Sequence, residues 1–308
     1  MSPRVTWLIP IRNGMPYLPE TLASIEAQTY QNWEVLAWDN GSTDGTSEEL
    51  RKWIPERLPG RIVTSIPLTV GASLARMVEQ CKTELCARID ADDINLPERL
   101  EQQVAFLERY PEVAVVGSQA YRIDSSGKTI EKFTKVPLRH RDILDLFLAY
   151  NVVLHSSVLF RRSAILAVGN YRDLPNVEDY DLWLWVASRY QLANLDRCLI
   201  KHRIHERSTT EKARKQARLV QLTNECLVKH APALYGCSTK EIQKLRLKRH
   251  PCSLLAFYRI AQYLERTQGD PWLERFRSRD FIFSGKELTA NHDIISRVIW
   301  RVLWALWG

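Results

Sequence analysis

The sequence predicts an α/β fold, in which a mostly parallel sheet carries helices on both faces, followed by an α-helical C-terminal extension. Over the first two thirds of the chain, short β-prone apolar runs alternate with segments of helical periodicity, which is typical of βαβ units. After about residue 210 the helical pattern continues without strands. The excess positive charge also lies there, because residues 208–308 carry a net charge of +9 and residues 1–207 a net charge of −2.

The first half of the sheet is predicted from strands and helices in alternation. The expected strands are 5–9, 34–38, 61–66, 85–89 and 113–116. The expected helices are 18–28, 46–53, 71–81 and 97–110. The last of these helices has Pro97 near its start, a position that proline favours.

The second half is less regular. We expect a hairpin turn at 124–128 between two edge strands, strands at 155–160 and 198–204, and helices at 141–150 and 178–190. The C-terminal helices are expected at 211–230, 239–248, 253–267 and 294–307. The predicted domains are therefore an α/β domain at 1–209, with halves of about 1–120 and 121–209, and a basic helical region at 210–308.

The composition indicates a globular protein with enough apolar residues for a large core, at 45% of 308 residues. The opening residues lead directly into the first strand, so we expect no secretory signal. The six cysteines form no Cys-x-x-Cys pair, which favours reduced thiols in the cytoplasm.

An acidic cluster follows the strand at 85–89. Asp90, Asp92 and Asp93 lie at its carboxyl end, the edge where open α/β sheets bind ligands. Hard divalent cations such as Mg²⁺ and Mn²⁺ prefer carboxylates together with substrate phosphates. The sequence thus predicts a site for a metal and a diphosphate, with a solvated acidic turn as the alternative.

Six motifs occur in a fixed order along the chain. They are IPIRNG (9–14), WDNGSTDGT (38–46), AR (75–76), DADD (90–93), EDYDLW (178–183) and RIH (203–205). With these motifs, residues from about 5 to 209 resemble the family 2 glycosyltransferases, inverting enzymes of the GT-A fold that use nucleotide-activated sugars. The resemblance implies a GT-A domain here.

The resemblance also implies which residues bind the nucleotide-sugar. They are Pro10, Ile11, Asn13, Asp39, Arg76, Asp90 and Ala91. Asp39 would accept a hydrogen bond from a pyrimidine base, although the sequence is equally compatible with an Asx turn. Arg76 suits the diphosphate or the base edge, because guanidinium offers forked donors to oxyanions. The family often has asparagine after this arginine, whereas this chain has Met77.

For the metal, the resemblance implies that Asp92 contacts Mn²⁺ or Mg²⁺ and that His205 is a further ligand. Asp90 would reach the ribose or the surroundings of the metal, and Asp93 would shape the site. The cation would neutralise charge on the departing diphosphate. A lone histidine is otherwise more often structural than ligating.

An acceptor hydroxyl must lose its proton as it attacks. The resemblance implies that Asp179 is the base and Glu178 its partner, or that the two roles are exchanged. Carboxylates at a helix start also simply stabilise the helix dipole, which is the alternative. His155 and Ser156 resemble the strand that borders the acceptor pocket in relatives. A single base and a metal-held leaving group imply one displacement with inversion.

Residues 294–308 have the pattern of a basic amphipathic helix with tryptophans, too short to span a bilayer. This pattern fits an anionic membrane surface, with docking on the protein's own helices or on a second subunit as the alternative. No nucleic-acid-binding motif accompanies the charge.

The expected function is transfer of a sugar from a nucleotide-sugar, with UDP-sugars as the expected donors, to a hydroxyl of a glycan or lipid-linked glycan. The expected setting is bacterial surface polysaccharide synthesis, in the cytoplasm or peripherally at the inner face of the plasma membrane. The alternative is a non-catalytic GT-A scaffold that binds glycan or membrane through its basic tail. A nucleotidyltransferase is disfavoured, because no Gly-rich phosphate loop follows the first strand. The sugar, the acceptor, the linkage and the oligomeric state stay open.

Overall fold

The computed structural model describes residues 4–134, 136–148, 150–206 and 217–246, together with Tyr263 and Arg266. The chain divides into two compact units, Met1–Thr223 and Asn224–Gly308. The domain boundary predicted between residues 209 and 210 falls in the stretch 207–216, outside the described residues. The sheet and the candidate site belong to the first unit.

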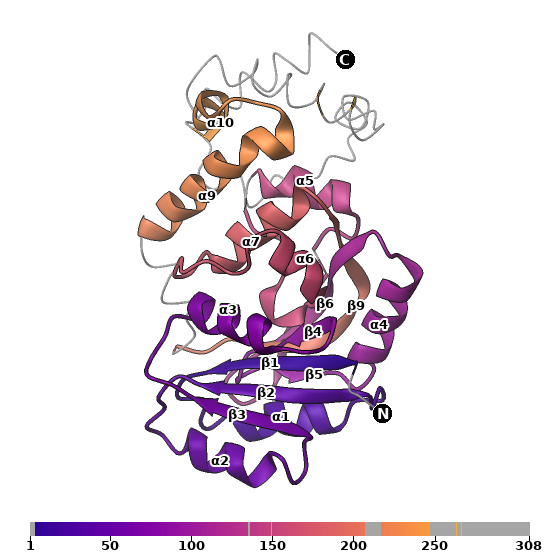
Figure 1. The fold of residues 1–308 in the computed structure, drawn as a ribbon, viewed down its shortest axis with the longest axis vertical. Coiled ribbons are helices and arrows are strands. Elements are labelled where there is room, and N and C mark those ends of the chain that lie inside the picture. The colour runs from indigo at the N-terminus through magenta and orange to yellow at the C-terminus, as the bar shows by residue number, and fades with distance from the viewer. Residues whose placement is uncertain are drawn as a thin grey trace. The chain divides into compact units, whose positions relative to one another are not determined.

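A nine-stranded sheet forms the framework of the first unit, in the order β3-β2-β1-β4-β8-β6-β9-β5, with β7 paired to β6 (Figure 1). The strands are β1 (Val5–Ile11), β2 (Trp33–Asp39), β3 (Gly60–Thr64), β4 (Leu85–Arg88), β5 (Ile94–Asn95), β6 (Val113–Ile123), β7 (Thr129–Phe133), β8 (Leu159–Arg161) and β9 (Gln191–Arg203).

Strand directions differ between the two halves of this sheet. β3, β2, β1 and β4 are parallel neighbours, as is the pair β6 and β9. β8 runs antiparallel to both β4 and β6, and β5 runs antiparallel to β9. The predicted α/β class is confirmed, and the second half of the sheet is mixed rather than parallel.

Helices connect these strands as the alternating pattern predicts, and the last two described helices follow the final strand. They are α1 (Leu18–Glu26), α2 (Thr46–Trp53), α3 (Val70–Gln80), α4 (Arg99–Arg109), α5 (His140–Phe147), α6 (Arg162–Ala167), α7 (Glu178–Ala187), α9 (Ala217–Tyr235) and α10 (Thr239–Arg246). The helices predicted at 253–267 and 294–307 lie outside the described residues. Within the part of the chain that the structure describes, every helix is too short or too polar to cross a membrane.

The core follows from the two-residue period of the strands. Val5, Trp7, Ile9 and Ile11 of β1 share one face and pack in a buried cluster with apolar residues of α1, α2 and α4. Leu8 alternates with them and is also fully buried, so β1 is covered on both faces. α3 contacts β1 and β2.

Two predicted strand assignments in the second half need correction. His155–Ser157 forms a 3₁₀ turn, η1, and the strand begins only at β8. The turn closes because both the N–H and the hydroxyl of Ser157 donate to the carbonyl of Leu154. The 124–128 turn does join β6 and β7, but β6 is not an edge strand, since it pairs with β8 and β9.

A fully buried arginine at the start of α4 holds three parts of the fold together. The guanidinium of Arg99 donates to backbone carbonyls and side-chain amides of Arg88, Ser156, Val158, Asn95 and Gln103. These oxygens belong to the end of β4, the 3₁₀ turn η1 and its exit, and the surroundings of α4. Arg99 also lies 5.0 Å from the ring centroid of Trp7. The hydrogen bonds of Arg99 therefore fix the carboxyl end of β4.

Replacing Arg99 by methionine should lower the free energy of unfolding by about 3 kcal/mol, because several buried carbonyls lose their donor. Urea unfolding would measure it. The matched control is Arg109→Met on the same helix, whose side chain is exposed and whose loss should cost less than about 0.5 kcal/mol. Equal losses in the two variants would contradict the role given to Arg99.

Candidate active site

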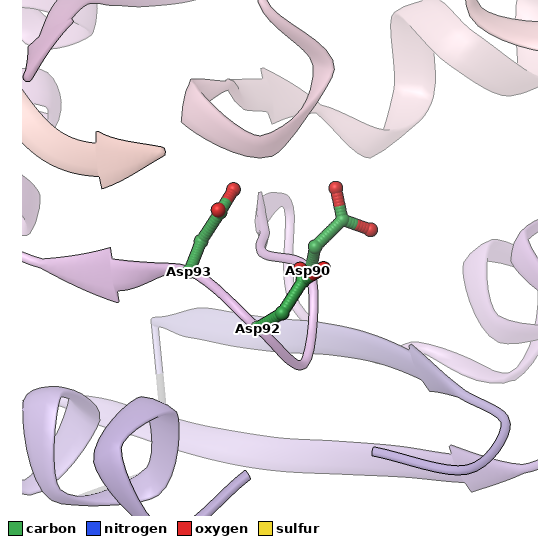
Figure 2. Close-up of side chains that lie close together, drawn as sticks. All are labelled: Asp90, Asp92 and Asp93. Atoms are coloured by element: carbon green, nitrogen blue, oxygen red, sulfur yellow. The ribbon is translucent and has the colours of Figure 1, made fainter. Parts of the chain in front are cut away.

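Three carboxylates gather just after β4. Oxygen atoms of Asp90, Asp92 and Asp93 lie within 4.8 Å of one another. Figure 2 shows the three side chains on the short loop between β4 and β5. The sequence pattern predicts this cluster at the carboxyl edge of the sheet, and the structure places it there.

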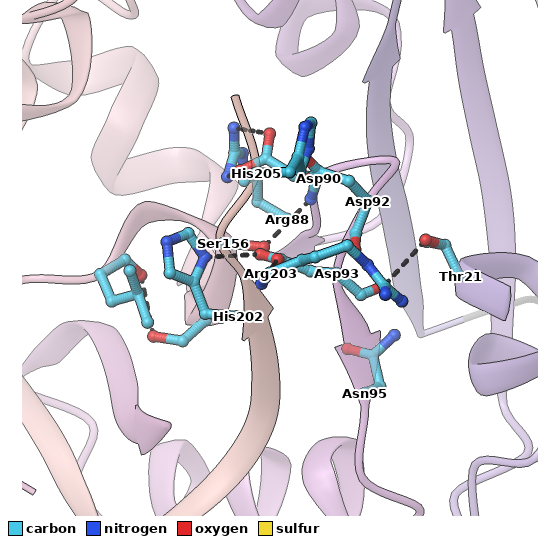
Figure 3. Close-up of polar contacts among 12 residues, drawn as sticks. Thr21, Arg88, Asp90, Asp92, Asp93, Asn95, Ser156, His202, Arg203 and His205 are labelled. Carbon is cyan, nitrogen blue, oxygen red and sulfur yellow. Dashed lines mark hydrogen bonds and ion pairs between the residues drawn. The ribbon is translucent and has the colours of Figure 1, made fainter. Parts of the chain in front are cut away.

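Each carboxylate has its own basic partner (Figure 3). Arg88 makes a two-pronged ion pair with Asp90, His205 Nε2 lies 2.9 Å from Asp92 Oδ2, and His202 Nδ1 lies 3.2 Å from Asp93 Oδ2. The predicted ligands Asp92 and His205 are therefore in contact, although 113 positions separate them. Arg88 and His202 were missed by the sequence reasoning.

The electrostatics distinguish these carboxylates. Burial raises the pKa of Asp92 to about 8, and the charges of Asp93 and Asp90 add to the effect. Burial opposes ionisation of Asp93 and His202 as well, but their attraction prevails, lowering the pKa of Asp93 and raising that of His202 to about 9. Asp93 and His202 form an ion pair, whereas burial keeps the ionised form of Asp92 disfavoured although His205 lies beside it. Oxygen donors crowded in this way, with an imidazole beside them, fit a divalent cation.

Another buried arginine, Arg203, anchors the segment that carries the histidines. Arg203 Nε donates to the carbonyl of Asp92 at 2.9 Å, and its backbone N–H donates to Asp93 Oδ1 at 2.8 Å. Its Nη2 reaches Glu20 Oε2 at 2.9 Å, and its guanidinium lies over the ring of Tyr17. The RIH motif contained this residue, but its periodicity did not reveal that the arginine is buried.

The loops after β1 and β2 are tied together through Asn13. Its Oδ1 accepts from the N–H of Thr43 at 2.9 Å, and its own N–H donates to Ser42 Oγ at 2.9 Å. Asn13 adopts a positive φ of 57°, which asparagine tolerates. Pro10 and Ile11 are buried at the end of β1. These predicted donor-binding residues therefore shape one edge of the sheet.

The remaining three predicted donor residues lie in different surroundings. Asp39 is fully buried and accepts from the N–H of Ser42 at 2.9 Å and from the hydroxyl of Ser47. The Asx-turn geometry is thus present, and base binding by Asp39 stays a prediction. Arg76 is exposed on α3. Ala91 lies close to Gly14, because a Cβ added at Gly14 would be 3.3 Å from the Cβ of Ala91.

The two residues predicted to act as the base and its partner, Asp179 and Glu178, lie at the start of α7. Asp179 Oδ2 accepts from Asn151 Nδ2 at 2.8 Å, and its Oδ1 accepts from the N–H of Tyr180 at 2.7 Å. Burial raises the pKa of Asp179 to about 6 and that of Glu178 to about 7, and the charge of Asp179 adds to the effect on Glu178. Helix-dipole stabilisation alone would lower both pKa values, so burial is the larger effect on these two carboxyls.

The two predicted acceptor-side residues lie in η1. His155 is 9% exposed, its Nε2 lies 2.9 Å from Tyr171 Oη, and its Nδ1 lies 4.0 Å from Asp179 Oδ2. Ser156 instead accepts from the N–H of Asp90 at 3.1 Å. Ser156 thus supports the carboxylate cluster, while His155 lies beside the predicted base, Asp179.

Glu178→Gln should stabilise the folded protein at alkaline pH. A carboxyl with a raised pKa disfavours folding above its ordinary pKa, most fully above the folded value of about 7. The gain should be about 2 kcal/mol at pH 8 and much smaller at pH 5, where the folded wild type holds the proton. Urea unfolding at both pH values measures it. Glu79→Gln, exposed on α3, is the control and should change neither value.

Solved structures with similar folds support the GT-A assignment. Residues 1–349 of Staphylococcus aureus TarS, in complex with UDP-GlcNAc, match with a TM-score of 0.60 at 14% identity, covering 86% of this chain and 81% of that one. The mannosyltransferase PcManGT from Pyrobaculum calidifontis, in complex with GDP-Man and Mn²⁺, matches with a TM-score of 0.60 at 18% identity, covering 99% and 85%. The predicted GT-A fold is confirmed.

Two relatives are closer in sequence. The amylovoran biosynthesis glycosyltransferase AmsE of Erwinia amylovora is 34% identical over 189 residues, covering 60% of this chain and 70% of the relative. The O-antigen biosynthesis glycosyltransferase WbnJ of Escherichia coli is 32% identical over 205 residues, covering 64% and 78%. The family model for glycosyl transferase family 2 matches residues 6–168, more than half of the chain. With the fold and the site residues described above, this match shows that the chain is a glycosyltransferase of family 2.

Proposed function

We propose that this glycosyltransferase is metal-dependent and inverting, and that it transfers a sugar from a nucleotide-sugar to a hydroxyl of a glycan or lipid-linked glycan. The observation that carries the proposal is the contact between Asp92 and His205 at the carboxyl end of β4. Both residues were predicted as metal ligands, and the fold brings them together from distant positions. UDP-sugars are the proposed donors.

On the donor side, Asp92 and His205 would hold Mn²⁺ or Mg²⁺. When bound, the cation supplies positive charge to a departing diphosphate. Asp90 is held in place by its ion pair with Arg88 and by the hydrogen bond from its backbone N–H to Ser156 Oγ. Its carboxylate would face the ribose side of the donor. The solved neighbours bound to UDP-GlcNAc or to GDP-Man and Mn²⁺ support this class of donor.

On the acceptor side, Asp179 would take the proton of the attacking hydroxyl. Its pKa of about 6 leaves it mainly ionised at neutral pH, yet still basic enough to accept a proton. Glu178, whose pKa is raised to about 7, would be only partly ionised at neutral pH and would carry part of the negative charge of the two carboxyls. A single base on the acceptor side would support one displacement with inversion.

The relatives support a role in bacterial surface polysaccharide synthesis, because AmsE and WbnJ are named for amylovoran and O-antigen biosynthesis. A cytoplasmic enzyme at the inner face of the plasma membrane would fit such a pathway. The membrane-binding helix predicted at 294–308 lies outside the described residues and stays a prediction.

Calorimetric titration of UDP and GDP, with and without Mn²⁺, tests the donor side. UDP should bind the wild type only with metal, and Asp92→Ala should weaken that binding at least ~tenfold, because the remaining ligands hold the cation poorly. Asp196→Ala, an exposed aspartate on β9, is the control and should bind as the wild type does. Absence of nucleotide binding under all conditions would favour the non-catalytic scaffold.

Asp179→Asn should abolish sugar transfer while leaving metal-dependent UDP binding within about twofold, because the amide accepts no proton. Wild-type transfer should fall as the pH drops through about 6, since Asp179 is then protonated. Initial rates from pH 5 to 9, measured as UDP release, check both statements. Transfer retained by this variant would exclude Asp179 as the base.

A further inference from the structure

Asp179 receives a hydrogen bond from a side chain outside its own helix. The contact to the N–H of Tyr180 comes with α7 itself. The contact from Asn151 Nδ2, at 2.8 Å, comes from a segment 28 positions earlier in the chain. Asn151 lies between α5 and η1, where no helix or strand imposes its position. Its side chain nevertheless reaches the predicted base.

The orientation of the Asn151 amide is determined by a second contact. Its Oδ1 accepts from the backbone N–H of Val153 at 3.1 Å. Turning the amide over would bring its NH₂ group against that N–H, so the NH₂ group must face Asp179. Asn151 is thus a fixed, neutral donor aimed at one carboxylate oxygen.

A second neighbour of that oxygen is His155, a buried histidine whose charged form is disfavoured. His155 Nδ1 lies 4.0 Å from Asp179 Oδ2, too far for a hydrogen bond, and its Nε2 is engaged with Tyr171 Oη. The ring also packs edge-on against Trp183. Burial, together with the charge of Arg88, lowers the pKa of His155 well below its usual value. Asn151 is therefore the close side-chain donor to this oxygen among the described residues.

We propose that Asn151 is a positioning residue for sugar transfer, which holds the carboxylate of Asp179 in its charged form and in a fixed plane. This inference rests on the proposed role of Asp179 as the base. A hydrogen bond to the charged form opposes the effect of burial on a carboxyl pKa. Asn151 acts on Asp179 in this direction. It would thus help to keep a buried base ionised at neutral pH, and a neutral donor lowers its basicity less than a counter-charge would.

Other titratable or charged groups also act on Asp179 from the elements packed around it. They are Glu178 on α7, His155 in η1, Tyr171 in the loop before α7, and Arg88 at the end of β4. Asn151→Ala removes none of these groups and adds no charge beside them. A change in the pH dependence of transfer in that variant can therefore be assigned to the Asn151 contact.

Asn151→Asp is the sharpest test, because it keeps the side-chain shape and the oxygen that accepts from Val153. It replaces only the amide nitrogen that faces Asp179 by an oxygen, so two carboxyls then share one place. The acidic limb of the kcat profile should move up by more than about one pH unit, and kcat at pH 6 should fall ~tenfold or more. The KM for the donor should stay within about twofold, since the donor side is untouched. Asn151→Ala should move the limb by about one unit.

Asn194→Asp is the matched control. Asn194 is a buried asparagine on β9 whose Nδ2 donates to the carbonyl of Pro137 at 2.7 Å, so the same substitution there disturbs a structural contact. This variant should lose thermal stability without moving the acidic limb.

A loss of stability in the Asn151 variants with an unmoved acidic limb would overturn the inference and leave Asn151 a structural residue. Asp179→Asn, assayed in parallel, separates this failure from that of the proposed function. If Asp179→Asn is inactive and the Asn151 variants show the wild-type profile, only the positioning role is wrong. If Asp179→Asn remains active, the base assignment itself is wrong, and the positioning role falls with it.

Discussion

The charge of three carboxylates within four positions is the constraint on which the rest of this fold depends. Carboxylates so close together disfavour one another's ionised form unless positive charge lies beside them. The chain supplies a separate basic partner to each, from Arg88 to Asp90, from His205 to Asp92 and from His202 to Asp93. Asp92 still has its pKa raised to about 8. The loop is thus charge-compensated enough to fold and still suited to a further cation.

The sheet topology explains how the two histidines reach this loop. β5 is only two residues long, yet it pairs antiparallel with β9, with Ile94 opposite Lys201. One step further along this antiparallel register, Asp93 is opposite His202, which is the observed ion pair. The long parallel pairing of β6 with β9 fixes β9 in the sheet. A short strand following the carboxylates therefore determines which residues compensate them.

Periodicity in the sequence was sufficient to predict the alternating strands and helices of the first half, and the motifs were sufficient to bring Asp92 and His205 together. The rest depended on tertiary contacts that leave no local pattern. β5 is too short to show a two-residue period of apolar side chains. Arginine is usually found at the protein surface, so the burial of Arg88 and Arg99 could not be expected from their residue type. Asn151 lies in an irregular segment, and its importance can be seen only from its hydrogen bond to Asp179 in the folded structure.

The two groups of carboxyls in this domain are treated in opposite ways. Those after β4 each have a basic partner, which suits the proposed binding of a cation and a diphosphate. Those at the start of α7 have neutral donors close by, and Arg88, whose charge lowers the pKa of both Asp179 and Glu178, is already paired with Asp90. Their ionised form is consequently disfavoured, which costs stability but raises basicity. Full compensation would have made these carboxyls permanently charged and poor proton acceptors. The incomplete compensation at α7 is thus consistent with the proposed role of Asp179 as a general base near neutral pH.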